Sequence, residues 1–61
     1  IMALKKTVGK FEIKGDNSGL VSVYKNGELQ KAVSCQPGQL EEKFNTVCEM
    51  VENYINKNKK Q

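Results

Sequence analysis

Two cysteines, Cys35 and Cys48, are the side chains of this 61-residue sequence best suited to act as a nucleophile or as a soft metal ligand. The sequence contains no histidine, which excludes a Cys–His catalytic pair. The two cysteines also lack the Cys-x-x-Cys spacing that is typical of zinc sites. We therefore predict no catalytic residue, no metal site and no cofactor.

The spacing of the cysteines also argues against a disulfide. If a helix begins at Pro37, Cys48 lies about 16 Å along its axis, whereas Cys35 is about 7 Å from the helix start. An offset of about 10 Å remains even where the helix folds straight back, and bridged Cα atoms are at most about 7 Å apart. We expect two free thiols. Cys48 would be a small buried apolar residue, and Cys35, beside a helix N-terminus, would be the more reactive one.

The seven carboxylates do not form an obvious acid–base pair. Asp16 and two glutamates fall in predicted strands or turns, and four glutamates between residues 41 and 52 alternate with apolar residues, as solvent-facing helix residues do. No two of them are forced into a shared pocket, and a chain of this length leaves little room for a ligand cavity. We predict that the protein is not an enzyme.

All ten basic residues are lysines, and the sequence carries a net charge of +3. The excess lies in residues 1–35, where six lysines accompany three acids. A nonspecific contact with nucleic-acid phosphates would use Lys5, Lys6, Lys10, Lys14 and Tyr24. The absence of arginine removes the side chain that best reads guanine, and lysine on exposed strands also blocks aggregation. Nucleic-acid binding is therefore the alternative prediction and not the favoured one.

One long amphipathic helix, predicted over residues 37–58, positions most of the apolar residues. Pro37 suits the first helical position, where its missing N–H leaves no bond unmade. Glutamates near the start and lysines near the end suit the helix dipole. The apolar positions fall within an arc of about 120°, and they are Leu40, Phe44, Val47, Cys48, Val51, Tyr54 and Ile55.

Three strands are predicted before this helix, over residues 5–14, 20–24 and 29–34. Turn signals separate them at residues 15–19 and at Asn26-Gly27. Gly9 weakens the first strand and indicates a bulge or a close backbone approach. The order β-β-β-α predicts an α+β fold, in which a three-stranded antiparallel meander is followed by one long C-terminal helix packed on one face.

This order loosely resembles, in topology, the arm-binding domains of tyrosine recombinases, whose sheet lies against a DNA groove. The resemblance implies a nucleic-acid contact through the sheet, where Lys10, Lys14 and Tyr24 would lie. Those domains tend to present arginine and aromatic residues there, and this sequence has no arginine.

Two registers are compatible with the turn at Asn26-Gly27. A two-residue turn would pair Tyr24 with Leu29 and place both on one face with Leu20 and Val33. A three-residue loop with Gly27 as a bulge would instead pair Val23 with Leu29. We favour the bulged version, because it places Val21, Val23, Leu29 and Val33 together under the helix, with Lys31 as the one misfit.

A three-stranded sheet would leave part of this helix uncovered. Twenty-two helical residues span about 33 Å, whereas a seven-residue strand spans about 23 Å. We predict that the overhanging end self-associates to form a homodimer, through Met50, Val51, Tyr54 and Ile55. In the competing arrangement, the first strand extends back to Leu4 and covers the helix end itself.

We expect a single domain over residues 2–58 and a frayed lysine-rich tail over residues 59–61. No hydrophobic run approaches the roughly 20 residues that span a membrane, and no signal segment is present, so a cytoplasmic location without a membrane is expected. The favoured function is a small non-enzymatic protein-interaction module that pairs with a second copy or with another protein.

Overall fold

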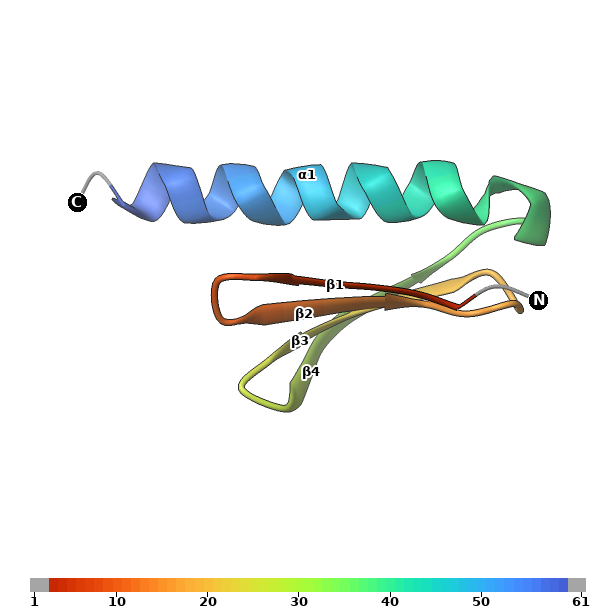
Figure 1. The fold of residues 1–61 in the computed structure, drawn as a ribbon, viewed down its shortest axis with the longest axis horizontal. Helices are drawn as coiled ribbons and strands as arrows, with labels where there is room; N and C mark the ends of the chain where they lie inside the picture. The colour runs from red at the N-terminus through yellow and green to blue at the C-terminus, as the bar shows by residue number, and fades with distance from the viewer. Residues whose placement is uncertain (1–2, 60–61) are drawn as a thin grey trace.

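The structure is a computed structural model that describes residues 3–59. Its elements, in chain order, are β1 (Leu4–Val8), β2 (Phe11–Gly15), β3 (Leu20–Lys25), β4 (Glu28–Ser34), the short 3₁₀ helix η1 (Pro37–Gln39) and α1 (Leu40–Lys59). The strands form one antiparallel sheet in sequence order, and α1 lies across one face of it (Figure 1). The α+β class and the C-terminal helix on one face are confirmed.

The prediction of three strands is wrong, because the sheet has four. The β-β-β-α order, on which the resemblance to arm-binding domains depends, is therefore not the order of this fold. Met2 and residues 60–61, which belong to the expected domain and tail, lie outside the described residues, and Lys59 is the last residue of α1. Within residues 3–59, no helix has both the length and the apolar character needed to cross a membrane.

The fourth strand arises because residues 5–14 form a hairpin and not one long strand. Gly9 has a φ of +59°, a left-handed conformation that glycine adopts without steric cost. Gly9 and Lys10 form a two-residue turn that begins with glycine, so that Val8 pairs with Phe11. The turn lets Val8 and Phe11 share the face that packs on the helix, whereas residues three apart on a continuous strand point to opposite faces.

The connection between β2 and β3, residues 16–19, confirms the predicted turn. It is organised by the carboxylate of Asp16, whose Oδ1 accepts hydrogen bonds from the Ser18 hydroxyl (2.6 Å), the Ser18 N–H (3.0 Å) and the Leu20 N–H (3.2 Å). These bonds, with that of the Ser18 hydroxyl as the largest cause, lower the pKa of Asp16 below its ordinary value of 3.8.

The turn between β3 and β4 differs from the favoured prediction. Asn26 and Gly27 have φ values of +54° and +85°, the pattern of a two-residue type I′ turn. Tyr24 consequently pairs with Leu29, and the three-residue loop is wrong. Leu29 lies on the outer face of the sheet with 57% of its surface exposed, so its expected place in the core is also wrong.

A bulge is nevertheless present, three residues further along β4. Tyr24 pairs with Leu29 but Val23 pairs with Lys31, which leaves Gln30 as the extra residue. After the bulge, Val21 pairs with Val33, and both share the helix-facing side. The helix-facing side of the sheet therefore collects Val21, Val23 and Val33, as predicted. Lys31 also lies on this side, and it is the one misfit that we expected there.

The core lies between α1 and the sheet. It is formed by side chains that are at most 7% exposed: Ile13, Val21, Val23, Leu40, Phe44 and Cys48. Their helical members repeat every four residues, which is the spacing of one helix face. The predicted apolar stripe is therefore the face that packs.

The helix begins with a 3₁₀ turn over Pro37–Gln39, so regular α-helix starts at Leu40 and not at Pro37. Its twenty residues span about 30 Å. The β1–β2 hairpin extends beneath its C-terminal half (Figure 1), and a Cβ at Gly9 would lie 3.1 Å from Cδ1 of Ile55. Ile55 therefore does not overhang the sheet. It is covered by the turn at Gly9 and not, as in the competing arrangement, by a strand that extends back to Leu4, because Leu4 pairs with Gly15 near Leu40 and Phe44 at the start of the helix.

Candidate functional site

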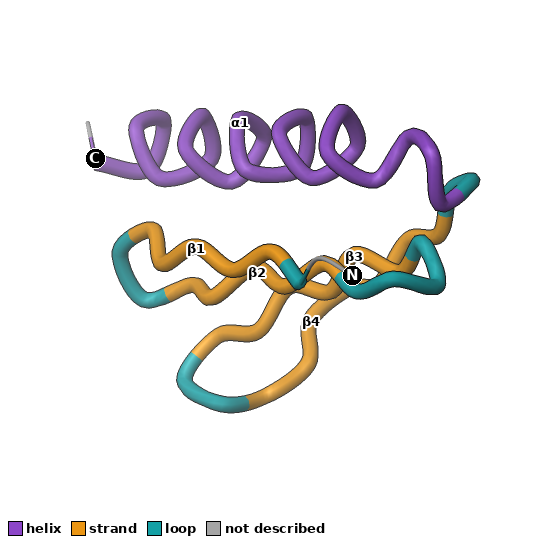
Figure 2. Tube along the Cα trace, turned by 45° about the vertical axis from the view of Figure 1, so that its right-hand side comes forward, coloured by secondary structure: helices purple, strands orange, loops and turns teal. Residues whose placement is uncertain are grey.

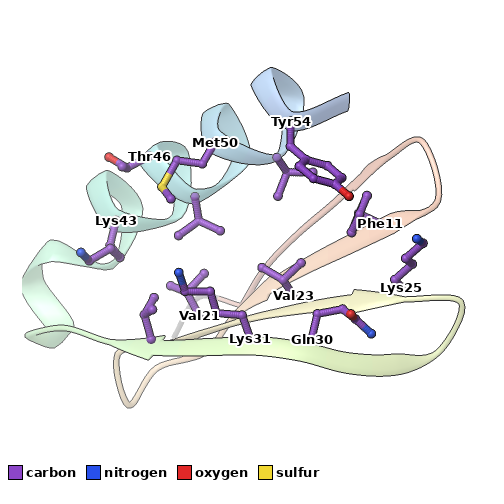
Figure 3. Close-up of a pocket in the computed structure, with 13 residues that line it drawn as sticks. Phe11, Val21, Val23, Lys25, Gln30, Lys31, Lys43, Thr46, Met50 and Tyr54 are labelled. Atoms are coloured by element: carbon purple, nitrogen blue, oxygen red, sulfur yellow. The ribbon is translucent and has the colours of Figure 1, made fainter. Parts of the chain in front are cut away.

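A groove of about 560 Å³ lies between α1 and the β3–β4 half of the sheet (Figure 3). We call it the α1–β4 groove. Its helix wall consists of Lys43, Thr46, Val47, Met50, Val51 and Tyr54. Its sheet wall consists of Phe11, Val21, Val23, Lys25, Gln30, Lys31 and Val33.

The groove exists because one helix cannot cover four strands. Strands lie about 4.8 Å apart, so the outer strands of this sheet are about 14 Å apart, whereas a helix is about 10 Å wide. Within the described residues, α1 packs on β1, β2 and β3 and makes no close backbone contact with β4. The tip of the β3–β4 hairpin also bends away from the helix (Figure 2), as the twist of a sheet predicts.

The walls of the groove are mainly apolar. Val47, Met50, Val51 and Tyr54 are spaced i, i+3, i+4, i+7 along the helix and form one stripe beside the core. Met50 and Tyr54 are 53% and 56% exposed, which is high for large hydrophobic residues. The Tyr54 ring meets the Phe11 ring edge to face, with centroids 6.0 Å apart, so the tyrosine is held in place while its other side remains open.

Three lysines surround this apolar surface, and none of its thirteen lining residues is acidic. Lys43 lies at one end of the helix wall, Lys25 lies near Tyr54 at the other end, and Lys31 lies along β4 (Figure 3). The ammonium group of Lys25 is 5.7 Å from the centroid of the Phe11 ring, within the range of a cation–π contact. The groove therefore combines an apolar interior with a cationic rim.

The four predicted self-association residues divide between the groove and the fold. Met50 and Tyr54 are exposed and line the groove. Val51 lines the base of its helix wall and packs against the core, so it is only partly accessible. Ile55 is half-buried at the β1–β2 turn, outside the groove. The accessible part of the predicted surface is thus the flank of α1 that faces β4.

Two of the predicted nucleic-acid residues, Lys5 and Lys14, lie side by side on the outer face of the sheet. Both form ion pairs with Glu12, at 3.2 Å and 3.8 Å, which partly neutralise them. The Lys14 ammonium is also 5.2 Å from the centroid of the Tyr24 ring. Lys5, Lys14 and Tyr24, together with Leu20, are among the residues that line an outer hollow of about 430 Å³.

The other two predicted lysines are elsewhere. Lys6 points to the helix side, where its ammonium group lies 3.4 Å from a carboxylate oxygen of Glu52. Lys10 is in the turn between β1 and β2. The structure therefore separates the expected row of four lysines, because the hairpin reverses the chain at Gly9-Lys10.

The two thiols occupy different environments, and both are free as predicted. Cys48 belongs to the buried core, and burial raises the pKa of its thiol above the ordinary value of 9.0. Cys35 is half-buried after β4, and its N–H donates a 2.8 Å hydrogen bond to the Gly19 carbonyl. Within residues 3–59, no cluster of three or more His, Cys, Asp or Glu side chains could hold a metal ion.

Two residues of the groove could be identified in part from the sequence. Met50 at the flank of the apolar stripe, and Lys31 as the misfit on the helix-facing side, are both lining residues. Gln30, Lys25 and Lys43 were missed, because their place depends on the bulge in β4 and on which strands the helix covers. Comparison of the chain with protein-family models, with curated proteins and with solved structures finds no match.

Proposed function

We propose that this chain is a small non-enzymatic protein-interaction module whose binding site is the α1–β4 groove. One observation carries the proposal: α1 covers only part of its face of the sheet and leaves an apolar groove open along β4. Exposed apolar surface of this kind, with a polar rim, is characteristic of interaction sites. Met50 and Tyr54 suit such a site, since methionine adapts to a partner and tyrosine can keep its hydroxyl in water.

Binding through the groove is favoured over pairing at the sheet edges. The edge strand β4 carries a bulge at Gln30 followed by Lys31, and the edge strand β1 carries Lys5 and Lys6. Bulges and lysines at edges are the usual devices that prevent a strand from another chain from pairing.

The partner can be a second copy or another protein. The exposure of Met50 and Tyr54 favours the dimer that we predicted from the sequence. The three lysines at the rim oppose it, because a two-fold contact would bring like charges together. Sedimentation of the chain over a tenfold range of concentration, up to several hundred micromolar, decides between the two partners.

Selection from a random peptide library tests the binding site itself. Peptides of about 16 residues, long enough to cross the groove as helix or strand, would be selected on the parent chain. They would then be tested against Met50→Lys, and against Asn45→Lys as a control that adds the same charge on the exposed face of α1. We expect Met50→Lys to abolish binding by most selected peptides while its melting temperature stays near that of the parent, since Met50 is exposed. Peptides that bind both variants equally would refute the proposed site.

A second candidate function is nonspecific binding of nucleic acid by the outer face. The observation that favours it is the hollow lined by Lys5, Lys14 and Tyr24. Each lysine that contacts a phosphate should contribute about one unit to the slope of log affinity against log salt. Glu12→Gln should strengthen binding because it frees two lysines, and the double variant Lys5→Gln, Lys14→Gln should weaken it. No binding of a labelled oligonucleotide by the parent at about 50 mM salt would eliminate this candidate.

A further inference from the structure

We infer that the α1–β4 groove receives an acidic amphipathic α-helix from a different polypeptide. This inference rests on the proposed function and specifies the partner of the same site. The helix would lie beside α1 over β3 and β4, so that two helices cover the sheet face that one helix covers incompletely.

The width of the sheet is the first argument. The outer strands are about 14 Å apart, and packed helices lie 8–10 Å apart, roughly two strand spacings. α1 packs on β1, β2 and β3 and makes no close backbone contact with β4 within the described residues. One further helix would therefore complete the layer.

The shape of the helix wall is the second argument. Its lining residues run from Lys43 to Tyr54, a stretch of twelve residues whose ends are about 16 Å apart, or three helical turns. Val47, Met50 and Tyr54 present ridges along this length, and ridges of one helix pack into the grooves of another. A partner helix of about eleven residues, with apolar positions at i, i+3, i+4 and i+7, would match the wall.

The charge of the rim identifies the partner's chemistry. Lys43 and Lys25 lie near opposite ends of the groove, and Lys31 lies along its β4 side (Figure 3). Since no lining residue is acidic, carboxylates on both flanks of an incoming helix would each find a lysine. Such rim pairs contribute modestly to affinity but discriminate strongly between partners, because a cationic helix meets repulsion on both flanks.

The same charges argue against a second copy as the occupant. The apolar stripe of α1 is already packed on its own sheet, and the flank that remains carries Lys43 two helical turns from Met50. Docking that flank into the groove of another copy would place lysine against lysine. A heterologous acidic helix buries the same apolar surface without this repulsion.

The test uses three synthetic peptides with identical leucines at i, i+3, i+4 and i+7. One carries glutamates on both flanks, one carries lysines there, and one is the glutamate peptide with a proline in its centre, which breaks the helix. Binding to the full chain is measured by fluorescence anisotropy. We expect the glutamate peptide to bind, the lysine peptide to bind at least about tenfold more weakly, and the proline peptide not to bind.

Substitutions in the chain assign this binding to the groove. Lys31→Glu should weaken the glutamate peptide and strengthen the lysine peptide, whereas Asn45→Lys should change neither. Equal binding of the glutamate and lysine peptides, or binding of the proline peptide, would overturn the inference. Displacement of the glutamate peptide by a single-stranded oligonucleotide would also overturn the inference. A stable dimer of the chain that becomes stronger in Lys31→Glu would overturn it as well. If none of the three peptides binds but library peptides do so in a Met50-dependent way, the inference fails while the proposed function stands.

Discussion

Replacing Phe44 with alanine should remove much of the stability of this fold. Phe44 is only 7% exposed and packs in the core between α1 and β2. Emptying a buried phenylalanine site costs roughly 3–5 kcal/mol, whereas a domain of about 60 residues has a total stability of roughly 3–9 kcal/mol. At about 4–8 °C for each kcal/mol, we expect the melting temperature to fall by at least about 12 °C.

The structure identifies Gly15 as a second site that should respond to this change. A Cβ at Gly15 would lie 3.2 Å from Cδ1 of Phe44 and 3.2 Å from Cδ1 of Leu40, both tighter than ordinary contacts. In the parent, Gly15→Ala should therefore be destabilising, because overpacking outweighs the roughly 0.4–1 kcal/mol gained by restricting the unfolded chain.

In the Phe44→Ala background, the Gly15→Ala substitution should be less destabilising, although the contact with Cδ1 of Leu40 remains. The contact with the ring is gone, and the new methyl group fills part of the vacated space, where a buried carbon contributes about 0.8 kcal/mol. We therefore expect the two substitutions to be coupled by about 1–2 kcal/mol.

Thermal and urea denaturation, both followed by far-UV circular dichroism, would measure all four proteins of this double-mutant cycle. If Phe44→Ala is unfolded in water, the same concentration of a stabilising osmolyte is added to every sample. Asn45→Ala, at the neighbouring exposed position, is the matched control. A Phe44→Ala variant that melts within a few degrees of the parent would show that this helix face does not pack. Additive effects of the two substitutions would show that the ring does not rest on Gly15.

Three further predictions concern the loops and the thiols. Gly19→Ala should lower the urea midpoint more than Gly27→Ala. Both glycines have a positive φ, +89° and +85°. A Cβ added at Gly19 would collide with the Cys35 carbonyl oxygen, whereas a Cβ added at Gly27 would meet nothing within 4 Å. Because the pKa of Asp16 is lowered, its carboxylate stabilises the fold above pH 3.8, and this contribution is lost as the pH falls through the lowered pKa. The parent should therefore lose more stability under acid than Asp16→Asn. Equal losses would contradict the role of the loop hydrogen bonds. In thiol labelling of the folded protein, Cys35 should react first and Cys48 only at the rate of unfolding, because Cys48 is 4% exposed. Mass spectrometry of the labelled peptides distinguishes the two thiols. Equal labelling rates would contradict the buried position of Cys48.

The helix could be predicted from the sequence because its signal is redundant. Leu40, Phe44 and Cys48 repeat at the spacing of one helical face, and rotating the helix about its axis so that another face packed would bury a glutamate. The number of strands was harder to predict, because a hairpin and a single strand show the same alternation of polar and apolar residues over a short stretch. Val8 was the decisive residue: only a turn at Gly9 allows it to share the face of Phe11.

The groove could not be predicted because it depends on the number of strands. With three strands, one helix would cover most of the sheet. With four strands, α1 makes no close backbone contact with β4 within the described residues. The position of the bulge was also undetermined by the sequence. Bulges at Gly27 or at Gln30 both place Val21 and Val33 under the helix, but only the second one turns Leu29 outward.

The order of the strands has a consequence for how this chain folds. Each strand pairs with its neighbour in sequence across a connection of two to four residues, and hairpins of this kind form in roughly 1–10 μs. The contact between α1 and β1 is different: Lys6 and Glu52 are 46 residues apart, so their approach requires closure of most of the chain. We expect the hairpins to be formed in the transition state and the helix to dock on β1 late. Substitutions between α1 and β1 should then mainly accelerate unfolding, which makes this contact the one that sets the lifetime of the native state.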